Sequence, residues 1–409
     1  MLMYANMKQR KSTPSSQQPV QLDTFTLLHL RLYQFLGLCS VPLQLKCDLA
    51  TVNQHPQRSS THPTWWFLLI WHCLHFIFFG LLQFWTSTNH DSVLYNSDRF
   101  GKFNDILKLI ATISAHFVIL SETILQRKYM QKFLITYSQL HCRWSLGTYR
   151  EEYGLYRTYV WKVIISTAVY LSIVVNYTQS IATRRQWLTF FLPFIPSGFI
   201  CHFRSIEIMY FMDMLRIELE QLNKNVERLV LFSQRKFQTS AQRLDYFEQT
   251  ICDELQTLMK NYEDIYEMSV LLKKAVGASI ACNYVKEYVM ILSECYWSYW
   301  MIYTGQDIIE YSLIVPSAMT IFLLLITSRN CMRSANFLAH NVHKIRHDLE
   351  DLNISTRLQS FTLQILHQRI IIDGIGFFVL NCNMARDVLG SIATYMLFFI
   401  QFMPKFKNI

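Results

Sequence analysis

Three histidines form the group in this sequence that most resembles a metal site. His340, His343 and His347 follow at i, i+3 and i+7, which places them on one face of a helix. Imidazole is a common metal ligand, so a membrane enzyme using this cluster is one hypothesis. Iron-dependent membrane oxidases gather their histidine ligands from several histidine motifs. This sequence has one such motif, and Lys344 and Arg346 lie between its histidines. We therefore favour a solvated or subunit-facing helix and predict no metal, no cofactor and no catalytic residue.

The common sequence motifs of enzymes are also missing. The chain contains no His-Glu-x-x-His, no Gly-x-Ser-x-Gly, no P-loop and no Gly-x-Gly-x-x-Gly. These motifs position a metal, a nucleophile or a phosphate, and their absence from the sequence argues against the corresponding enzyme classes.

Charged side chains inside long apolar stretches form a second group of candidates. A charge in the hydrocarbon region costs several kcal/mol unless it faces protein or water. Glu294 lies deep in its stretch, and we expect it to be functional. Lys286 and Glu287 are adjacent, so we expect them to point to different faces of one helix without neutralising each other. The remaining candidates, some of them expected to be structural, are His116, Glu122, Arg204, Glu207 and Arg386.

Aromatic residues crowd the stretch that follows Glu294. Tyr296, Tyr299, Trp300 and Tyr303 share one helical face at i, i+3, i+4 and i+7. An aromatic belt at the lipid interface explains one or two such rings and needs no ligand. Four rings on one face also suit a pocket for a small organic ligand, with Glu294 supplying a polar group. Both interpretations stay open.

The last apolar stretch combines a hydroxyl, a ring and an amide on one face. Thr394, Phe398 and Gln401 are spaced i, i+4 and i+7. If copies of this helix surrounded an axis, Phe398 would form a hydrophobic constriction and Gln401 a polar ring beside it. The same pattern, taken alone, fits a packing helix with a polar seam, which is the more common arrangement.

The composition indicates the class of structure that positions these residues. Of 409 residues, 51% are hydrophobic and 16% charged, where a soluble protein carries about 25% charged residues. Lys and Arg are spread between apolar runs, so the net charge of +9 gives no reason to expect a nucleic-acid partner. The sequence predicts an all-α polytopic membrane protein. Seven stretches have the length of a membrane span: residues 64–86, 106–126, 160–182, 187–209, 280–303, 308–328 and 374–403.

The distribution of positive charge predicts the orientation in the membrane. Residues 25–45 form an eighth apolar stretch, but His29, Arg31 and Pro42 interrupt it, so we expect an amphipathic helix on the membrane surface. With seven spans, Lys and Arg concentrate in the N-terminal segment and in the connections on the same side. Positively charged connections stay cytoplasmic. The N-terminus is therefore predicted to be cytoplasmic and the C-terminus extracellular.

The end of the chain resembles the C-terminal signature of insect gustatory receptors. Thr394 and Tyr395, five apolar residues, then Gln401 and Phe402 match the pattern Thr-Tyr, five hydrophobic residues, Gln-Phe. The resemblance implies a ligand-gated cation channel that is a homotetramer or associates with other gustatory receptors. It also implies the plasma membrane of a gustatory neuron's dendrite as location. The family's pore positions correspond to Phe398 and Gln401, with Thr394 and Tyr395 beside them.

The resemblance also bears on the ligand and on the organisation of the chain. It implies a ligand pocket in the outer part of the first six spans, where the aromatic face lies. Sugar receptors of the family usually have Glu after the Thr-Tyr pair, but this chain has Met396, so a bitter or aversive tastant is favoured over a sugar. The predicted parts are a cytoplasmic segment with the surface helix (1–63), spans one to four (64–212), a cytoplasmic helical region (213–279), spans five and six (280–328), a cytoplasmic helical segment (329–373) and a pore-lining helix with an extracellular tail (374–409).

A G-protein-coupled receptor is the main alternative, since it also has seven spans. Its N-terminus would be extracellular, against the distribution of charge. The chain also lacks the Asp-Arg-Tyr and Asn-Pro-x-x-Tyr motifs of that class.

Overall fold

A computed structural model describes residues 24–42, 63–89, 99–145, 153–182, 187–234, 241–304, 314–345 and 352–402. Within these ranges the chain forms ten α-helices and no strand, so the predicted all-α class is confirmed. The helices are α2 (Thr24–Phe35), α3 (Pro63–Thr88), α5 (Arg99–Leu125), α6 (Arg127–Ser145), α7 (Tyr153–Ala182), α8 (Trp187–Ser233), α9 (Ala241–Thr304), α10 (Ile314–Val342), α11 (Leu352–His367) and α12 (Cys382–Phe402).

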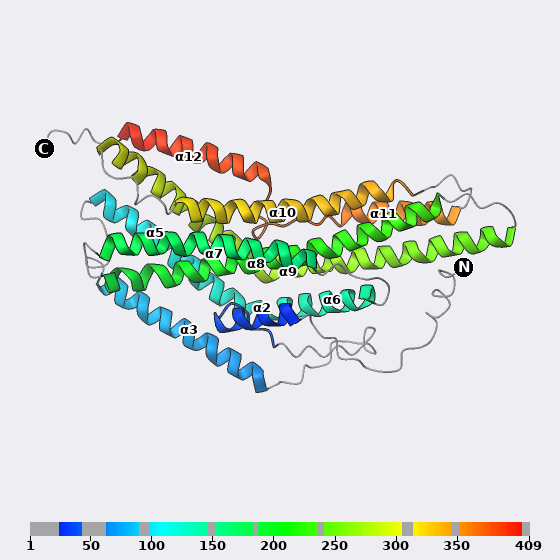
Figure 1. Ribbon diagram of the computed structural model, residues 1–409, viewed down its shortest axis with the longest axis horizontal. Coiled ribbons are helices and arrows are strands. Elements are labelled where there is room, and N and C mark those ends of the chain that lie inside the picture. The colour runs from blue at the N-terminus through cyan, green and yellow to red at the C-terminus, as the bar shows by residue number, and fades with distance from the viewer. Residues whose placement is uncertain are drawn as a thin grey trace.

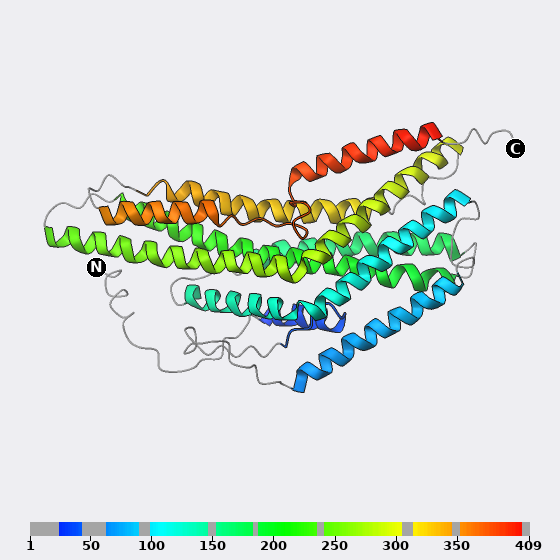
Figure 2. The same ribbon diagram turned by 180° about the vertical axis from the view of Figure 1, so that it is seen from behind.

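The helices form an elongated bundle around α8 and α9. These two run along most of its length, with α10 packed on α8 and α5 on α9 (Figure 1). Helices α3 and α12 lie on opposite sides of the bundle and diverge from it, while α6 and α11 flank its other half (Figures 1 and 2). The bundle therefore has a closely packed axis and two peripheral helices.

Four helices are long and apolar enough to cross a membrane. In the described part of the chain they cover Trp66–Thr88, Lys102–Leu125, Thr158–Asn176 and Ile314–Val342, which correspond to four of the seven predicted spans. The other three predicted spans lie in α8, the second half of α9 and α12. The second half of α9 carries Lys286, Glu287 and Glu294, and α12 carries Arg386 and Asp387, so charged residues interrupt these two stretches. The total of seven membrane spans therefore stays a prediction.

The first described helix is short and amphipathic. Helix α2 has 12 residues, or about 18 Å at the rise of an α-helix, which is too short to cross a hydrocarbon core of about 30 Å. His29 on its buried face packs against Tyr33 of the same helix and Tyr210 of α8, and the Tyr159 hydroxyl of α7 lies 3.0 Å from His29 Nδ1. Burial lowers the pKa of His29 to about 3, so the imidazole stays neutral at physiological pH.

Helices α8 and α9 continue far beyond the length of a span. Helix α8 has 47 residues and α9 has 64, which makes α9 about 96 Å long along its contour. Leu215, Leu219 and Leu222 of α8 are fully buried, as is Leu255 of α9, and the two helices pack on each other. The region 213–279, predicted to be helical, lies in the second part of α8 and the first part of α9 over its described residues.

The last helix begins later than the sequence predicted. Residues 374–381 were assigned to the final span, but they form a tight turn, and α12 begins at Cys382. The turn is closed by a β-bridge between Asp373 and Val379 and by a hydrogen bond of 3.0 Å from the Gly374 amide to the Phe378 carbonyl. Gly376 has a φ of 80°, a conformation that favours glycine. The segment 374–381 before α12 is therefore a turn and not part of a helix.

A buried ion pair ties three helices of the bundle together. Lys162 of α7 donates to Asp213 of α8 at 2.6 Å and to the Thr327 hydroxyl of α10 at 2.8 Å. The Asp213 side chain is fully inaccessible. A buried charge is costly unless it is paired, so this contact favours one arrangement of the three helices.

We expect Asp213→Ala to destabilise the protein by about 3–5 kcal/mol, because Lys162 would remain buried without its carboxylate. Glu267→Ala is the matched control, since Glu267 forms an exposed pair with Lys132 at 2.5 Å and its loss should cost about 0–1 kcal/mol. Thermal unfolding of purified protein, followed by size-exclusion chromatography, measures both. Equal melting temperatures would contradict the structural role of the buried pair.

Candidate functional site

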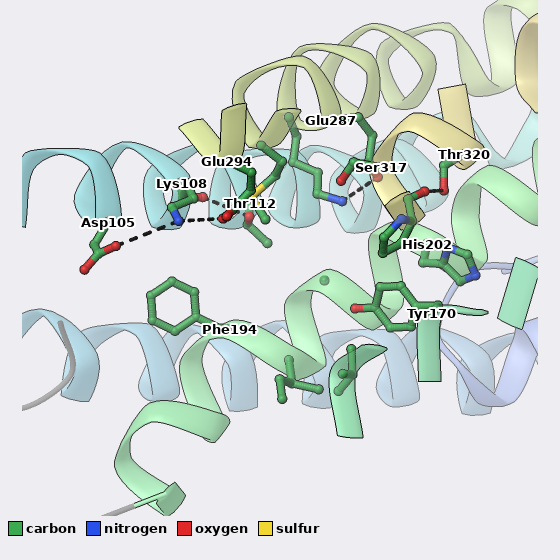
Figure 3. A pocket seen from close by; sticks show the side chains of 16 residues that line it. Asp105, Lys108, Thr112, Tyr170, Phe194, His202, Glu287, Glu294, Ser317 and Thr320 are labelled. Atoms are coloured by element: carbon green, nitrogen blue, oxygen red, sulfur yellow. Dashed lines mark hydrogen bonds and ion pairs between the residues drawn. The ribbon is translucent and has the colours of Figure 1, made fainter. Parts of the chain in front are cut away.

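A cavity lies between five helices of the bundle. It has a volume of about 100 Å³, and α5, α7, α8, α9 and α10 each contribute to its wall (Figure 3). On this measure one water molecule needs about 10–15 Å³, so the cavity has room for several water-sized groups. Its walls combine charged and aromatic side chains, which suits a small polar organic molecule.

One end of the cavity carries a cluster of three charges. Lys108 of α5 donates to Glu294 of α9 at 2.8 Å, and Asp105 lies 3.9 Å from the same ammonium group. All three side chains are almost fully buried. Glu294, which we expect from the sequence to be functional, thus lines the cavity and is paired with a residue of another helix.

The other end carries a second ion pair. Lys286 Nζ lies 2.6 Å from Glu287 Oε1, although the two residues are adjacent on α9. The expectation that these neighbours would not neutralise each other is wrong. Both side chains are long enough to turn toward the cavity, and burial makes pairing favourable because neither charge has water around it.

Aromatic side chains face these charges across the cavity. Tyr170 of α7 and Phe194 of α8 lie on the side opposite Lys108 (Figure 3). The Tyr170 ring stacks on His202 with centroids 4.5 Å apart. Gly198 makes room for the Tyr170 hydroxyl, since a Cβ atom at position 198 would lie 2.9 Å from it. This glycine therefore permits the close approach of α7 and α8.

The aromatic face predicted from the sequence is only partly described by the structure. Among Glu294, Tyr296 and Tyr299, whose side chains are described, only Glu294 lines the cavity. Tyr296 is buried and packs edge-on against Trp297 at 5.6 Å, and Tyr299 is half-buried. The side chains of Trp300 and Tyr303 lie outside the described residues.

Most of the cavity residues were missed by sequence reasoning. Among them, Asp105, Lys108, Tyr170 and Phe194 come from three helices that are distant in sequence. Lys108 could have been identified from the sequence, because it is a charged residue inside a predicted span. Tyr170 and Phe194 could not, since aromatic residues are common throughout these helices.

The predicted pore residues are exposed side chains of α12. Thr394, Tyr395, Phe398 and Gln401 are all exposed, and the Thr394 hydroxyl donates to the Gly390 carbonyl at 2.9 Å. Thr394, Phe398 and Gln401 lie opposite the face that packs against the bundle and partly buries Met384, Ala385, Val388 and Ile392. The structure therefore brings the four predicted residues together on one helix, away from the cavity.

The histidine cluster is only partly described. His340 lies in the last turn of α10 and His343 just after it, while His347 falls outside the described residues. Within the described part of the chain, no three metal-binding side chains come together.

Helix α9 connects the cavity to the last helix. Glu287 lines the cavity, and the next residue, Tyr288, donates from its hydroxyl to Ser391 of α12 at 3.1 Å. One turn earlier, the Tyr284 ring lies 4.9 Å from Phe378 in the turn that leads to α12. The same segment thus forms a wall of the cavity and a support for the last helix.

A family model described as "7tm Chemosensory receptor" matches residues 26–406 of this chain. The chain belongs to this receptor family. The resemblance seen in the last nine signature residues is confirmed over almost the whole sequence, and the histidine-based enzyme hypothesis has no support from the match.

Two curated relatives of the receptor come from Drosophila melanogaster. "Putative gustatory receptor 2a" is 24% identical over 243 residues, covering 53% of this chain and 56% of the relative. "Gustatory receptor 23a" is 22% identical over 156 residues, covering 36% of this chain and 40% of the relative. The matched part thus spans about half the length of these relatives.

The fold of the receptor is similar to that of a solved insect olfactory receptor. OR5 from Machilis hrabei, in complex with eugenol, superposes with a TM-score of 0.55 at 11% identity, covering 93% of this chain and 99% of that one. A second structure of OR5 gives a TM-score of 0.55 at 10% identity, covering 92% of this chain and 97% of that one. The two proteins share an architecture.

We expect Gly198→Ala to destabilise the receptor by about 1–3 kcal/mol, because the new methyl group displaces the Tyr170 hydroxyl. Tyr170→Phe in the same chain should remove most of this loss. Gly80→Ala serves as control, since no atom lies within 4 Å of the added Cβ there, and alanine favours a helix by up to about 1 kcal/mol. Thermal unfolding of the purified variants measures the effects. The close contact is refuted if Tyr170→Phe gives no rescue.

Proposed function

We propose that the receptor is a gustatory receptor that acts as a ligand-gated, non-selective cation channel. One observation carries the proposal: α9 lines the cavity with Glu287 and contacts the last helix through Tyr288, with a hydroxyl-to-hydroxyl distance of 3.1 Å. A molecule that binds in the cavity therefore acts on a helix that touches the proposed pore. Membership of the chemosensory receptor family supports this assignment.

The cavity is the proposed ligand site. Its wall holds three carboxylates and two ammonium groups, Asp105, Glu287, Glu294, Lys108 and Lys286. Such a wall favours a small polar compound that forms hydrogen bonds over a purely hydrocarbon one. We propose a bitter or aversive tastant over a sugar because Met396 stands after the Thr-Tyr pair. OR5, which has the same fold, was solved with the small molecule eugenol.

The aromatic face of α9 is proposed to extend this site toward the end of the helix. Tyr296, Tyr299, Trp300 and Tyr303 follow directly on Glu294. Their rings would contact a ligand as it approaches the cluster of Asp105, Lys108 and Glu294. They would also contact the outer part of a ligand that is too large for the cavity.

The last helix is the proposed pore lining. Phe398 has 52% of its surface exposed, and Thr394, Tyr395 and Gln401 are exposed as well. We propose that four copies of α12 face a common axis, in a homotetramer or together with other gustatory receptors. Phe398 then forms the hydrophobic gate and Gln401 a polar ring next to it.

The receptor is proposed to lie in the plasma membrane of gustatory neurons, at the dendrite. The surplus of Lys and Arg in the N-terminal segment and in the connections on its side supports a cytoplasmic N-terminus and an extracellular C-terminus. On this topology the cavity lies in the outer half of the bundle, and the second part of α8 and the first part of α9 form the cytoplasmic part.

Gating follows from a difference in affinity. A ligand opens the channel only if it binds the open arrangement more tightly than the closed one. Binding between α5 and α9 would change the position of the outer half of α9, and the contacts of Tyr284 and Tyr288 would transmit this change to α12.

Phe398→Ala is expected to produce a cation current without ligand, because the hydrophobic constriction is removed. Changes at Gln401 are expected to alter conductance or ion selectivity. Whole-cell recording of the full-length chain, with surface labelling to confirm equal expression, measures both. If wild type conducts and neither variant changes the current, the pore assignment is wrong.

Glu294→Gln is expected to raise the half-maximal concentration of an activating compound by at least about tenfold, because a charge-assisted hydrogen bond of about 1.5–3 kcal/mol is lost at the cavity wall. The compound is the one that gives the largest wild-type current in a panel of bitter substances. Glu267→Gln, an exposed carboxylate on the same helix, is the control. If Glu294→Gln and the control respond at the same half-maximal concentration, the proposal that the cavity is the ligand site is contradicted.

A further inference from the structure

Helix α9 bends near its middle, where a side chain from another helix meets its backbone. The bend is visible from both sides (Figures 1 and 2). The amides of Ala278 and Ser279 donate to the two carboxylate oxygens of Glu122 of α5, each at 2.8 Å. In a regular helix these amides donate to carbonyls four residues earlier. A side chain that enters this hydrogen-bond pattern is a known cause of kinks.

The carboxylate of Glu122 is held in place by further polar contacts. It accepts a short hydrogen bond from the Ser279 hydroxyl and lies 3.6 Å from Arg204 Nη2. Arg204 in turn donates from Nε to the Ser279 hydroxyl oxygen at 3.1 Å. Glu122 and Arg204 are both almost fully buried. A negative charge at the start of a helical segment is stabilised by the helix dipole, so Glu122 caps the outer half of α9.

The bend also lies against the turn that leads to the last helix. A Cβ atom at Gly277 would lie 3.5 Å from both the Cγ1 and the backbone nitrogen of Ile375. Ile375 itself has a φ of 54°, an unusual value for a β-branched residue. One turn of α9 earlier, Lys273 forms an ion pair with Asp373. The turn between residues 372 and 381 is therefore attached to α9 at the bend.

Beyond the bend, the same helix reaches both the cavity and α12. Lys286 and Glu287 line the cavity, while Tyr284 and Tyr288 contact Phe378 and Ser391. The direction of this outer segment depends on the angle of the bend. Any change of that angle moves the cavity wall and the support of α12 together.

We infer that Glu122, held by Arg204, is a positioning residue that sets the bend of α9 and thereby the place of the last helix relative to the cavity. This inference rests on the proposed channel function, because the place of α12 matters only if α12 lines a pore. The residue acts through the backbone of α9 and touches neither the cavity nor the pore helix in the described contacts.

Glu122→Gln tests the inference with little change in size. A Gln side chain accepts from one amide through its oxygen but presents N–H donors to the other. The control is Glu207→Gln, because Glu207 pairs with the same Arg204 at 2.6 Å and is equally buried, while its described bonds do not reach the amides of α9. The two variants therefore separate loss of the cap from general disturbance of the buried arginine.

Two measurements on the full-length protein in lipid nanodiscs decide the outcome. Electron cryomicroscopy should show a straighter α9 and a displaced α12 in Glu122→Gln and an unchanged bend in Glu207→Gln. Hydrogen exchange of the segment around residues 276–282 should be at least about tenfold faster in Glu122→Gln than in the control. An unchanged bend, or equal changes in both variants, overturns the inference.

A rescue variant keeps the test decisive if Glu122→Gln folds poorly. Ala278→Pro removes the first amide, keeps the Ser279 hydroxyl that contacts Glu122 and Arg204, and favours a kink by itself. Glu122→Gln combined with Ala278→Pro is expected to fold and to recover the wild-type bend; failure to do so counts against the inference. Both measurements need neither ligand nor current. Their failure is therefore distinct from failure of the channel assignment, which the Phe398 variant tests by its current.

Discussion

Buried charges need partners, and in this receptor several of these partners come from a different helix. Lys162 joins α7 to α8, Lys108 joins α5 to α9, and Arg204 lies between α8, α9 and α5. Apolar packing fixes the relative position of helices less specifically, since cores tolerate exchanges of hydrophobic side chains when volume is kept. A buried ion pair tolerates no such shift, because separating the charges leaves both unsolvated. The helix arrangement around the cavity follows from this requirement.

The sequence predicted the elements better than their connections. The spacing of Leu215, Leu219 and Leu222 in the sequence predicts one helical face, and all three side chains are buried in the structure. The start of the last helix was misplaced because residues 374–381 are apolar and Gly-rich, which does not distinguish a span from a turn. Only the hydrogen bonds from Gly374 to Phe378 and from Leu380 to Ile372 make this segment a turn.

The site was harder to predict than the fold. Glu294 was recognised because a charge inside a span is costly without a partner, but the partner Lys108 lies 186 residues away in sequence. No periodicity within one helix reports which face of another helix it meets. The same limit explains Lys286 and Glu287, whose pairing depends on a shared buried environment and not on their angular separation along α9.

The length of α9 has a consequence for how relatives of this receptor can diverge. Successive residues on a helix are turned by about 100°, and Glu287 and Tyr288 serve different neighbours, the cavity and α12. Inserting or deleting one residue between Ser279 and Glu287 would rotate every later side chain of α9 out of register with both neighbours. Evolution of new ligand preferences in this segment is therefore confined to substitutions at constant spacing, while changes of length are left to the loops.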